Sequence, residues 1–355
     1  MFTVISDTHL HNWSLFNRSP EVGENTRLNE ILSAIEDCAR AAREKQPDKI
    51  YPVRIYHGGD LFHVRGSLTP SVLNRVVQRL QEINAKYFVN IIVIAGNHDL
   101  ETKDSCELGN AAQSLNSLGF VEVVSKVEFF YDNRIVMLPW RHSLDDLRAD
   151  LSAAKQHILD GDLDLSSWTA IIHAPVNGVV MGIPDHGFNG EELASYGFGL
   201  VLSGHYHNHK EVAKQVYSIG ALTHQTWGDI GSKAGYLTVG DDLVVTHHET
   251  SAPKFIDYDP EDEESCKGNY VRVRLGEVTE SEIKKIRQHI IDIGALGNVI
   301  QSMPKREAIA RSGSTVESGK SMIGSIEAWI NEQDFTCDKA EVLLKCESIL
   351  QEIEA

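Results

Sequence analysis

Residue types that bind metal ions recur at five places along the sequence. The five motifs are SDTH, GGD, GNHD, IIHAP and GHYH, in this order. They supply carboxylate, imidazole and amide groups, which suit Mn²⁺, Fe or Zn²⁺, and their lack of thiolates argues against a structural zinc site. The candidate ligands are Asp7, His9, Asp60, Asn97, His173, His205 and His207.

One carboxylate among these ligands could serve two metal ions. Two cations about 3.5–4 Å apart need a bridging carboxylate to offset their repulsion, and Asp60 is the natural bridge. A single motif of this kind is usually an ordinary loop whose histidines are hydrogen-bonded. Five motifs in this order favour a binuclear metal centre over five unrelated loops.

Strands must position the ligands, because each motif accompanies a short apolar run. These runs cover residues 2–5, 52–57, 90–96, 170–174 and 200–204. Apolar residues at helical spacing lie between them, as at 28–38 and at 72–83 after a Thr69-Pro70 start. The alternation of strands and helices predicts an α/β domain. The later runs, among them GYLTV and LVVTHH, lack long helices between them and predict a more antiparallel second sheet.

The composition excludes some classes of protein. The chain has 355 residues, with 33 Lys and Arg against 51 Asp and Glu, which argues against binding nucleic acid over its whole surface. It has no run of about 18 apolar residues, so we expect no membrane span. The start MFTVISDTH is typical of a first strand and not of a signal peptide. Five scattered cysteines fit a reducing compartment, so we expect a cytoplasmic protein.

The motifs D-x-H, G-D, G-N-H-D, H and G-H-x-H resemble the calcineurin-like metallophosphoesterase superfamily, over a domain of residues 1–255. The resemblance implies a four-layer αββα sandwich, α/β in class, and two divalent metals, with Mn²⁺ the expected ion. One metal would be held by Asp7, His9, Asp60 and His207. The other would be held by Asp60, Asn97, His173 and His205. His98 would lie just outside the metals, over the scissile phosphate.

The residue three positions after Asp60 indicates which branch of the superfamily the sequence resembles. In phosphatases of the superfamily this residue is usually an aspartate, whereas here GGDLFH ends in His63. A histidine there is similar to the SbcD-type nucleases, the nuclease subunits of DNA-break-repair complexes, in which it lies near the DNA phosphate. The alternative is that His63 is an ordinary surface histidine after a strand.

The nuclease resemblance implies a 3′ to 5′ exonuclease and single-strand endonuclease in double-strand break processing. The metals would activate the attacking water and hold charge on the phosphate. His98 or His63 would donate a proton to the leaving sugar oxygen. Two alternatives stay open. One is a phosphomonoesterase or cyclic-nucleotide phosphodiesterase of the same superfamily, and the other is a scaffold with a vestigial, metal-free site.

The composition changes after residue 256. The acidic run DYDPEDEE is typical of a solvated linker. Residues 265–311 hold nine Lys and Arg against five Asp and Glu, and fit a small β-α-β unit placed like the capping domain of SbcD-like nucleases. The candidate DNA contacts are Arg272, Arg274, Lys284, Lys285 and Arg287. The alternative is that these charges form only a solvated face.

Residues 320–355 follow a Gly/Ser-rich stretch and are predicted to form two amphipathic helices on an acidic segment. By resemblance, this segment docks onto the coiled coil of an SbcC-like ATPase. The alternative is packing on the chain's own core. DNA and the ATPase are therefore the expected partners, and a second copy of the chain, in a homodimer, is a further candidate.

Other residues near the motifs could act from outside the ligand set. Asp99 could orient a neighbouring imidazole. Trp13 could stack on a base, although packing within a loop is the simpler interpretation. Further candidates for contacts with the ligands are His57, His142, His209 and His224.

Overall fold

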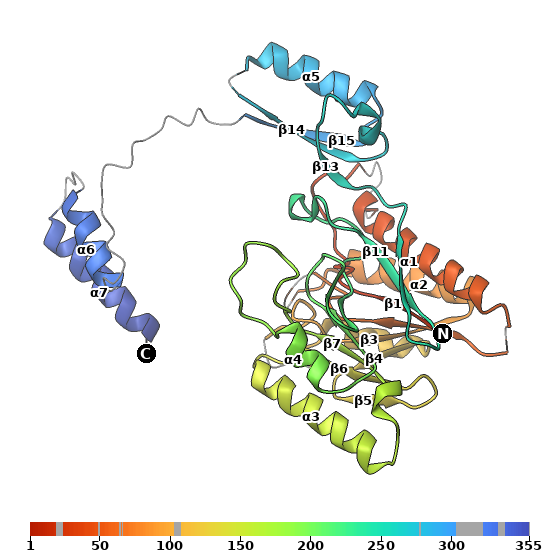
Figure 1. Ribbon diagram of the computed structural model, residues 1–355. Helices are drawn as coiled ribbons and strands as arrows, with labels where there is room; N and C mark the ends of the chain where they lie inside the picture. The colour runs from red at the N-terminus through yellow and green to blue at the C-terminus, as the bar shows by residue number, and fades with distance from the viewer. Residues whose placement is uncertain are drawn as a thin grey trace. The chain divides into compact units, whose positions relative to one another are not determined.

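The computed structural model describes residues 1–18, 24–48, 50–63, 65, 67–102, 108–276, 278–302, 322–332 and 338–354. The chain divides into two compact units. The larger is made of Met1–Arg274 and Thr279–Gln301, and the smaller of Leu275–Val278 and Ser302–Ala355. Figure 1 labels the helices and strands of both units.

The first sheet of the larger unit has the strand order β12-β11-β1-β2-β3-β4. Strands β1 to β4 are parallel, β11 pairs antiparallel with β1, and β12 pairs antiparallel with β11 at the edge of the sheet. The strands are β1 (Phe2–Ile5), β2 (Val53–His57), β3 (Val89–Ile94), β4 (Val121–Val124), β11 (Gly235–Val239) and β12 (Val245–Glu249).

The second sheet has the order β5-β6-β7-β8-β10-β9. Strands β6, β7, β8 and β10 are parallel, and only the two edge strands pair antiparallel. The strands are β5 (Glu128–Phe130), β6 (Ile135–Leu138), β7 (Thr169–His173), β8 (Leu200–Gly204), β9 (Lys210–Ala213) and β10 (Val216–Ser218). The prediction of a more antiparallel second sheet is therefore wrong. Every residue of β7 and β8 is buried, as in parallel sheets covered on both faces, while GYLTV and LVVTHH join the first sheet.

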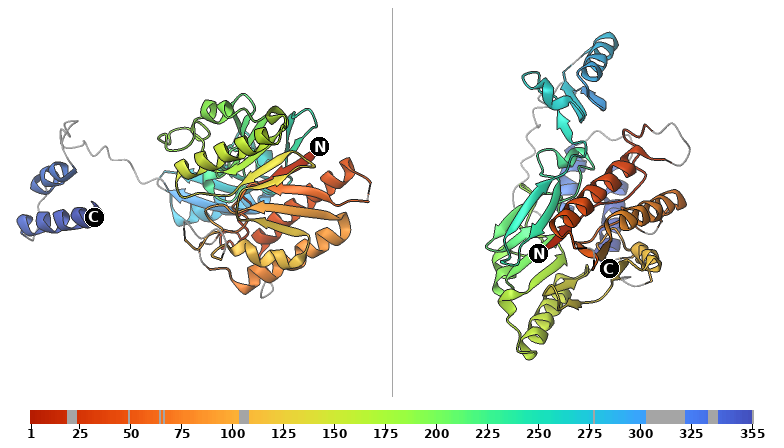
Figure 2. Two further views of the ribbon diagram at one scale, coloured as in Figure 1. Left: turned by 90° about the horizontal axis from the view of Figure 1, so that it is seen from below. Right: turned by 90° about the vertical axis from the view of Figure 1, so that its right-hand side faces the viewer.

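Helices cover the outer face of each sheet, as the two views of Figure 2 show for α1 and α2 on one side and α3 on the other. The helices are α1 (Thr26–Lys45), α2 (Pro70–Tyr87), α3 (Leu144–Asp160) and α4 (Gly190–Ser195), with short 3₁₀ helices η1 (Ala111–Leu118), η2 (Leu165–Ser167) and η3 (Trp227–Asp229). A side-chain cap and a proline explain where α1 and α2 begin. The Asn25 side chain accepts from Leu28 N at the start of α1, and Pro70 opens α2.

Three buried apolar clusters hold these layers together. One lies between α1, α2 and the first sheet, and another lies between α3, α4 and the second sheet. The third joins the two sheets face to face, with Val4, Tyr56 and Ile92 on one side and Met137, Ile171 and Leu202 on the other. The predicted four-layer αββα sandwich is therefore confirmed.

A small α+β unit follows the sandwich. Its sheet has the order β13-β14-β15, and its helix α5 begins with a capping box between Thr279 and Glu282. The elements are β13 (Phe255–Asp257), η4 (Glu263–Cys266), β14 (Tyr270–Leu275), α5 (Glu280–Asp292) and β15 (Gly297–Ser302). The predicted β-α-β order is confirmed. The acidic run is not only a linker, because its first residue, Asp257, belongs to β13 and pairs with Arg272.

The smaller unit contains α6 (Met322–Glu332) and α7 (Lys339–Glu354), which contact each other. Ile330 is buried, whereas Trp329 is 55% and Leu344 is 66% exposed. The two helices that the sequence predicts are present. The domain boundaries 1–255, 265–311 and 320–355 stay predictions, and residues 303–321 and 333–337 lie outside the described residues.

Candidate metal centre

The candidate ligands follow the carboxyl ends of strands in both sheets. In the first sheet, β1 leads to Asp7 and His9, β2 to Asp60, and β3 to Asn97. In the second sheet, β7 ends with His173, and β8 leads to His205 and His207. Parallel strands end at a common edge of their sheet, and the stacked sheets place these two edges beside each other. Side chains far apart in the sequence therefore converge.

The main chain has an unusual conformation at several candidate ligands. Those with positive φ angles are Asp7 (49°), His9 (43°), Asp60 (56°) and His205 (105°). Such a conformation costs of order 1–3 kcal/mol per non-glycine residue and clusters at functional sites. The turns between them are tight, since a Cβ on Gly59 would strike the His173 ring and one on Gly96 would strike Asp60. The fold thus holds this edge in a strained, fixed arrangement.

A first group of possible metal-ligand atoms comes from Asp7, His9 and His207, which lie within 4.8 Å of one another. His9 Nε2 lies 4.0 Å from Asp7 Oδ1 and 3.3 Å from His207 Nε2. It also lies 3.6 Å from Asp60 Oδ2, so Asp60 reaches this group as well.

A second group comes from Asp60, His173 and His205, again within 4.8 Å of one another. His173 Nε2 lies 3.5 Å from Asp60 Oδ2. Asn97 Oδ1 completes the group, at 3.2 Å from His173 Nε2 and 3.0 Å from His205 Nδ1. Asp60 Oδ2 is close to one histidine of each group, which is the position that a bridging carboxylate needs.

The chemistry of this donor set fits divalent cations. His173 Nδ1 donates to the Gly58 carbonyl oxygen at 2.7 Å, and His207 Nδ1 lies 2.6 Å from Asp229 Oδ1. A carbonyl or carboxylate oxygen only accepts, so each Nδ1 carries hydrogen, and in the neutral form of each ring the lone pair of Nε2 points toward the other ligands. Acceptor atoms that face each other this closely need a cation or a proton between them. Imidazoles fixed from behind in this way are typical of metal sites.

Burial and neighbouring charges shift the pKa values of these ligands in opposite directions. Burial raises the pKa of Asp7 to about 6, although His173 opposes the rise. Burial also disfavours ionisation of Asp60, but His173 and His9 hold its pKa well below the usual range. Asp60 in turn raises the pKa of His173 to about 9 in spite of burial. Burial lowers the pKa of His205 to about 3. Negative charge is therefore concentrated on Asp60, between the two groups.

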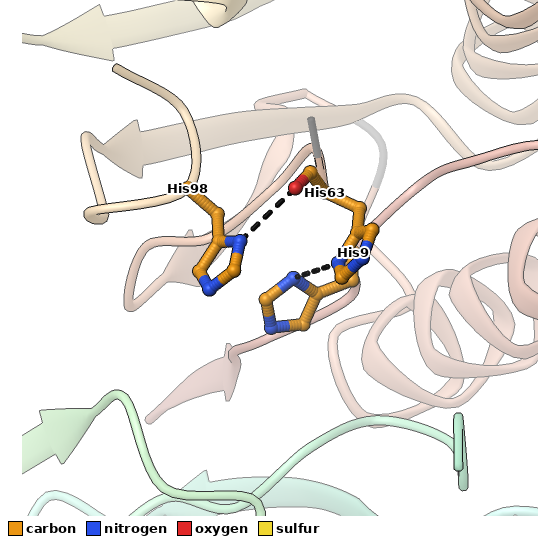
Figure 3. Close-up of side chains that lie close together, drawn as sticks. All are labelled: His9, His63 and His98. Carbon is orange, nitrogen blue, oxygen red and sulfur yellow. Dashed lines mark hydrogen bonds between the residues drawn. The ribbon is translucent and has the colours of Figure 1, made fainter. Parts of the chain in front are cut away.

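His98 and His63 lie beside the ligands (Figure 3). His98 Nδ1 donates to the main-chain carbonyl oxygen of His63 at 3.0 Å, and its main-chain N donates to Asp60 Oδ1 at 2.8 Å. His63 Nδ1 lies 3.2 Å from His9 Nδ1, and the His63 and His98 rings stack with 5.2 Å between their centroids. His63 is therefore a half-buried residue of the site. Its role, and that of His98, stay predictions.

Residues outside the ligand set include two that sequence reasoning missed. Asp229 binds His207, and the Gln225 side chain donates to the main-chain carbonyl oxygen of Asp7 at 2.6 Å. The expected role of Asp99 is wrong. Its carboxylate accepts main-chain N–H groups of Leu61, Phe62 and Gly96 and so ties two ligand-bearing loops together, with no imidazole among its described hydrogen bonds.

Trp13 and the four histidines predicted from the sequence to lie near the ligands differ in their distance from the candidate metal centre. Trp13 packs within its loop, because its Nε1 donates to the His9 carbonyl oxygen at 3.2 Å. His57 lies beneath the site, bonded to Thr8 and Gly59. The others lie apart from the ligand atoms in their described contacts: His142 is exposed, His209 bonds Ser218 and stacks on His247, and His224 bonds Phe255 and Ser232.

The basic residues predicted to contact DNA are of two kinds. The Arg272 guanidinium donates to both Asp257 carboxylate oxygens, at 2.6 and 3.0 Å, and lies 5.1 Å from the Trp227 ring centroid. Arg274 lies 3.3 Å from the same carboxylate. The exposed basic residues of α5 are Lys284, Lys285 and Arg287. Contact with DNA stays a prediction for all five.

The sequence matches the family model of the calcineurin-like phosphoesterases over residues 1–209. The chain therefore belongs to the calcineurin-like phosphoesterase family, a family of metal-dependent hydrolases. A crystal structure of the protein TT1561 of Thermus thermophilus is similar at 12% identity with a TM-score of 0.40, over 70% of this chain and 97% of that chain. No curated protein matches the sequence.

None of the described helices is both long enough and apolar enough to cross a lipid bilayer.

Proposed function

We propose that this hydrolase is a two-metal phosphodiesterase that cleaves DNA, similar to the SbcD-type nucleases. The observation that carries the proposal is the position of His63, with its ring between Trp13 and His98 and 3.2 Å from His9. A carboxylate at this position would repel an approaching phosphate. An imidazole can instead donate a hydrogen bond to the phosphate of DNA, and a histidine here is the feature by which the sequence resembles the SbcD-type nucleases.

The two groups of ligand atoms would each hold one divalent cation, with Mn²⁺ the proposed ion. Asp7, His9 and His207 would bind one, Asn97, His173 and His205 the other, and Asp60 both. When bound, the pair of cations would acidify a water molecule and neutralise charge on the phosphate. Asp229 and the Gly58 carbonyl oxygen keep the ring nitrogens of His207 and His173 turned inward for this purpose.

His98 is the proposed proton donor to the leaving sugar oxygen. Because the His63 carbonyl oxygen can only accept, Nδ1 of His98 keeps its hydrogen, and the proton given to the leaving oxygen would be the second one, on Nε2 of the imidazolium form. The bond from its main-chain N to Asp60 fixes His98 relative to both ligand groups. A positioned general acid of this kind contributes about 10²–10⁴-fold to the rate.

Two regions away from the ligands are proposed to bind partners. The exposed Lys284, Lys285 and Arg287 on α5 would contact the DNA backbone. The helices α6 and α7 would dock onto the coiled coil of an SbcC-like ATPase, a proposal supported by the exposure of Trp329 and Leu344 on a separate unit. The ATPase would supply much of the DNA affinity, because the chain carries a net charge of −18.

Digestion of end-labelled DNA tests the proposal. The purified chain should shorten duplex DNA from its 3′ ends and cut single strands with Mn²⁺, and both activities should stop with a chelator. Parallel assays with Mg²⁺, an aryl phosphomonoester and a cyclic nucleotide measure the alternative activities. Faster hydrolysis of the phosphomonoester or the cyclic nucleotide than of DNA would overturn the nuclease proposal in favour of the other branches of the family.

A further inference from the structure

Arg27 is a buried charge close to the start of α1 that the proposed chemistry does not use. Its side chain is only 2% exposed. Nη2 donates to the main-chain carbonyl oxygens of His224 and Gln225, at 3.1 and 3.4 Å. Nε lies 3.3 Å from Glu30 Oε2. A guanidinium out of water is stable only when its donors are matched in this way, so these contacts fix its position.

The same guanidinium lies against the small α+β unit. Its central carbon is 4.8 Å from the ring centroid of Phe255 in β13 and 5.1 Å from that of Tyr270 in β14. The Tyr270 hydroxyl donates to Glu30 Oε1 at 2.6 Å, which closes a ring of contacts around Arg27. The Tyr270 ring also stacks on Phe16, with 4.5 Å between centroids and 2° between planes. A displacement of β13 or β14 would therefore change the surroundings of Arg27.

The carbonyl oxygens that Arg27 holds belong to the loop that supports the first ligand group. The Gln225 side chain donates to the Asp7 carbonyl oxygen, and the main-chain N–H groups of Gln225 and Thr226 donate to Asp229 Oδ2 at 2.8 and 2.7 Å. Asp229 Oδ1 lies 2.6 Å from His207 Nδ1. Arg27 is thus linked through one loop to Asp7 and His207. The described link to the second ligand group is one step longer, because it continues through the Asp7 carboxylate, which accepts the main-chain N–H of His205 at 3.1 Å.

We propose that Arg27 is a positioning residue that couples the small α+β unit to the first of the two ligand groups. Through the carbonyl oxygens of His224 and Gln225 it sets the position of the loop, and the loop sets the orientation of Asp7 and His207. The α+β unit and the first metal position should therefore respond to each other, while the second position, reached only through Asp7 and Asp60, should respond less. The inference rests on the proposed metal centre.

A purely structural role for Arg27 is the competing explanation, and the chain offers a matched control. Arg43 lies on the same helix, is 6% exposed and also binds main-chain carbonyl oxygens, those of Tyr87 and Phe88 among them. Its contacts lie away from the candidate ligands. Arg27→Lys and Arg43→Lys both keep the charge but lose the planar fork that binds several acceptors at once. Both should lower the Tm.

Titration of the full chain with Mn²⁺, followed by calorimetry, distinguishes the two roles. We expect two sites in the wild type, and about tenfold weaker binding at one of them in Arg27→Lys, as when the partner of a metal-ligating histidine is lost. Arg43→Lys should bind both ions as the wild type does. Asp229→Asn should weaken Mn²⁺ binding at the same site as Arg27→Lys. In the double variant, the affinity of this site should fall by less than the product of the two single-variant factors, because both residues act through one loop.

Several results would overturn the inference. Equal weakening of both sites in Arg27→Lys, or no weakening, would assign Arg27 to stability alone. Tyr270→Phe is a second test that does not depend on the folding of Arg27→Lys, because it removes only the hydroxyl that binds Glu30. It should weaken the same site by a smaller factor, and wild-type binding at both sites would contradict the coupling. A wild-type chain that binds no Mn²⁺ would instead reject the metal centre, and the inference with it.

Discussion

The site brings together two kinds of histidine, which differ in whether a carboxylate lies among the possible ligand atoms around them. His173 and His207 are fixed from behind by an oxygen and present Nε2 toward the other ligand atoms. His98 is fixed by the His63 carbonyl oxygen and belongs, with His9 and His63, to a third group of possible ligand atoms, which contains neither Asp60 nor Asp7 nor any other carboxylate. This difference supports ligands in the first case and a proton donor in the second.

Replacement of His98 tests that separation. His98→Ala should keep wild-type Mn²⁺ binding and DNA binding but lower kcat by about 10²–10⁴-fold, because it removes an interaction made in the transition state. Calorimetry and single-turnover cleavage measure the two effects. The exposed His142 gives a control, since His142→Ala should change neither. Loss of Mn²⁺ in His98→Ala would make His98 a ligand.

His63→Ala should impair the cleavage of DNA more than the hydrolysis of a small substrate. The main-chain carbonyl oxygen that holds His98 remains in this variant, so the change reports on the His63 ring alone. DNA cleavage should fall at least about tenfold more than hydrolysis of a small aryl phosphodiester, since the ring is proposed to bind the DNA phosphate. The ratio of kcat/KM for the two substrates measures this. Equal losses would leave His63 without a role in DNA recognition.

Sequence alone predicts which ligand residues gather but not what supports them. Asp7, Asp60 and His173 each accompany an apolar run in a recognisable motif, so their convergence follows from the parallel strands. Asp229 has no such signal. It lies 22 residues after His207, and its contact depends on the fold of the intervening loop. No sequence pattern distinguishes Arg27 either, because it is one charged residue at the start of an amphipathic helix.

At the scale of elements, alternation of strands and helices was sufficient to predict the sandwich but not the pairing of its later strands. GYLTV and LVVTHH are short and lack helices between them, which fits either sheet. Pairing is decided by long-range contact, since β11 lies beside β1 across most of the larger unit's sequence. The strand β13 was missed because three residues beside an acidic run carry no periodic pattern.

The elements of the small α+β unit permit a test of DNA contact. Arg272 is engaged by Asp257 and Trp227, so the exposed lysines of α5 should contribute more to DNA binding. Changing Lys284 and Lys285 to Glu should weaken DNA binding and reduce its salt dependence, with unchanged turnover of a small phosphodiester. Lys214→Glu, exposed between β9 and β10, is the control. Unchanged DNA binding after the reversal would leave α5 a solvated face.

At the scale of the whole molecule, the chain combines a metal-dependent hydrolase fold with a separate pair of helices. The net charge of −18 makes strong DNA binding by this chain alone unexpected. In the proposed nuclease, most of the DNA-binding energy would come from bound cations, from local basic residues and from a partner. The proposal assigns the partner to α6 and α7, which belong to the smaller of the two units.

Removal of α6 and α7 tests this division. A chain that ends at residue 312 should stay folded, bind Mn²⁺ and hydrolyse small phosphodiesters like the wild type, because the described residues of the three sandwich clusters include none from α6 or α7. It should no longer bind an SbcC-like ATPase. Leu344→Asp should approach the same loss, since interface energy concentrates in a few apolar side chains. Precipitation of the shortened chain would place the helices in its own core.

The metal stoichiometry of the wild type and of Asp60→Asn tests the central claim most directly. Asp60 lies between both ligand groups, so an amide at this position should impair both. Calorimetric titration should give about two Mn²⁺ per wild-type chain and fewer in Asp60→Asn, with DNA cleavage abolished in the variant. A wild type that binds one ion or none, or an Asp60→Asn variant that binds two and still cleaves DNA, would contradict the account.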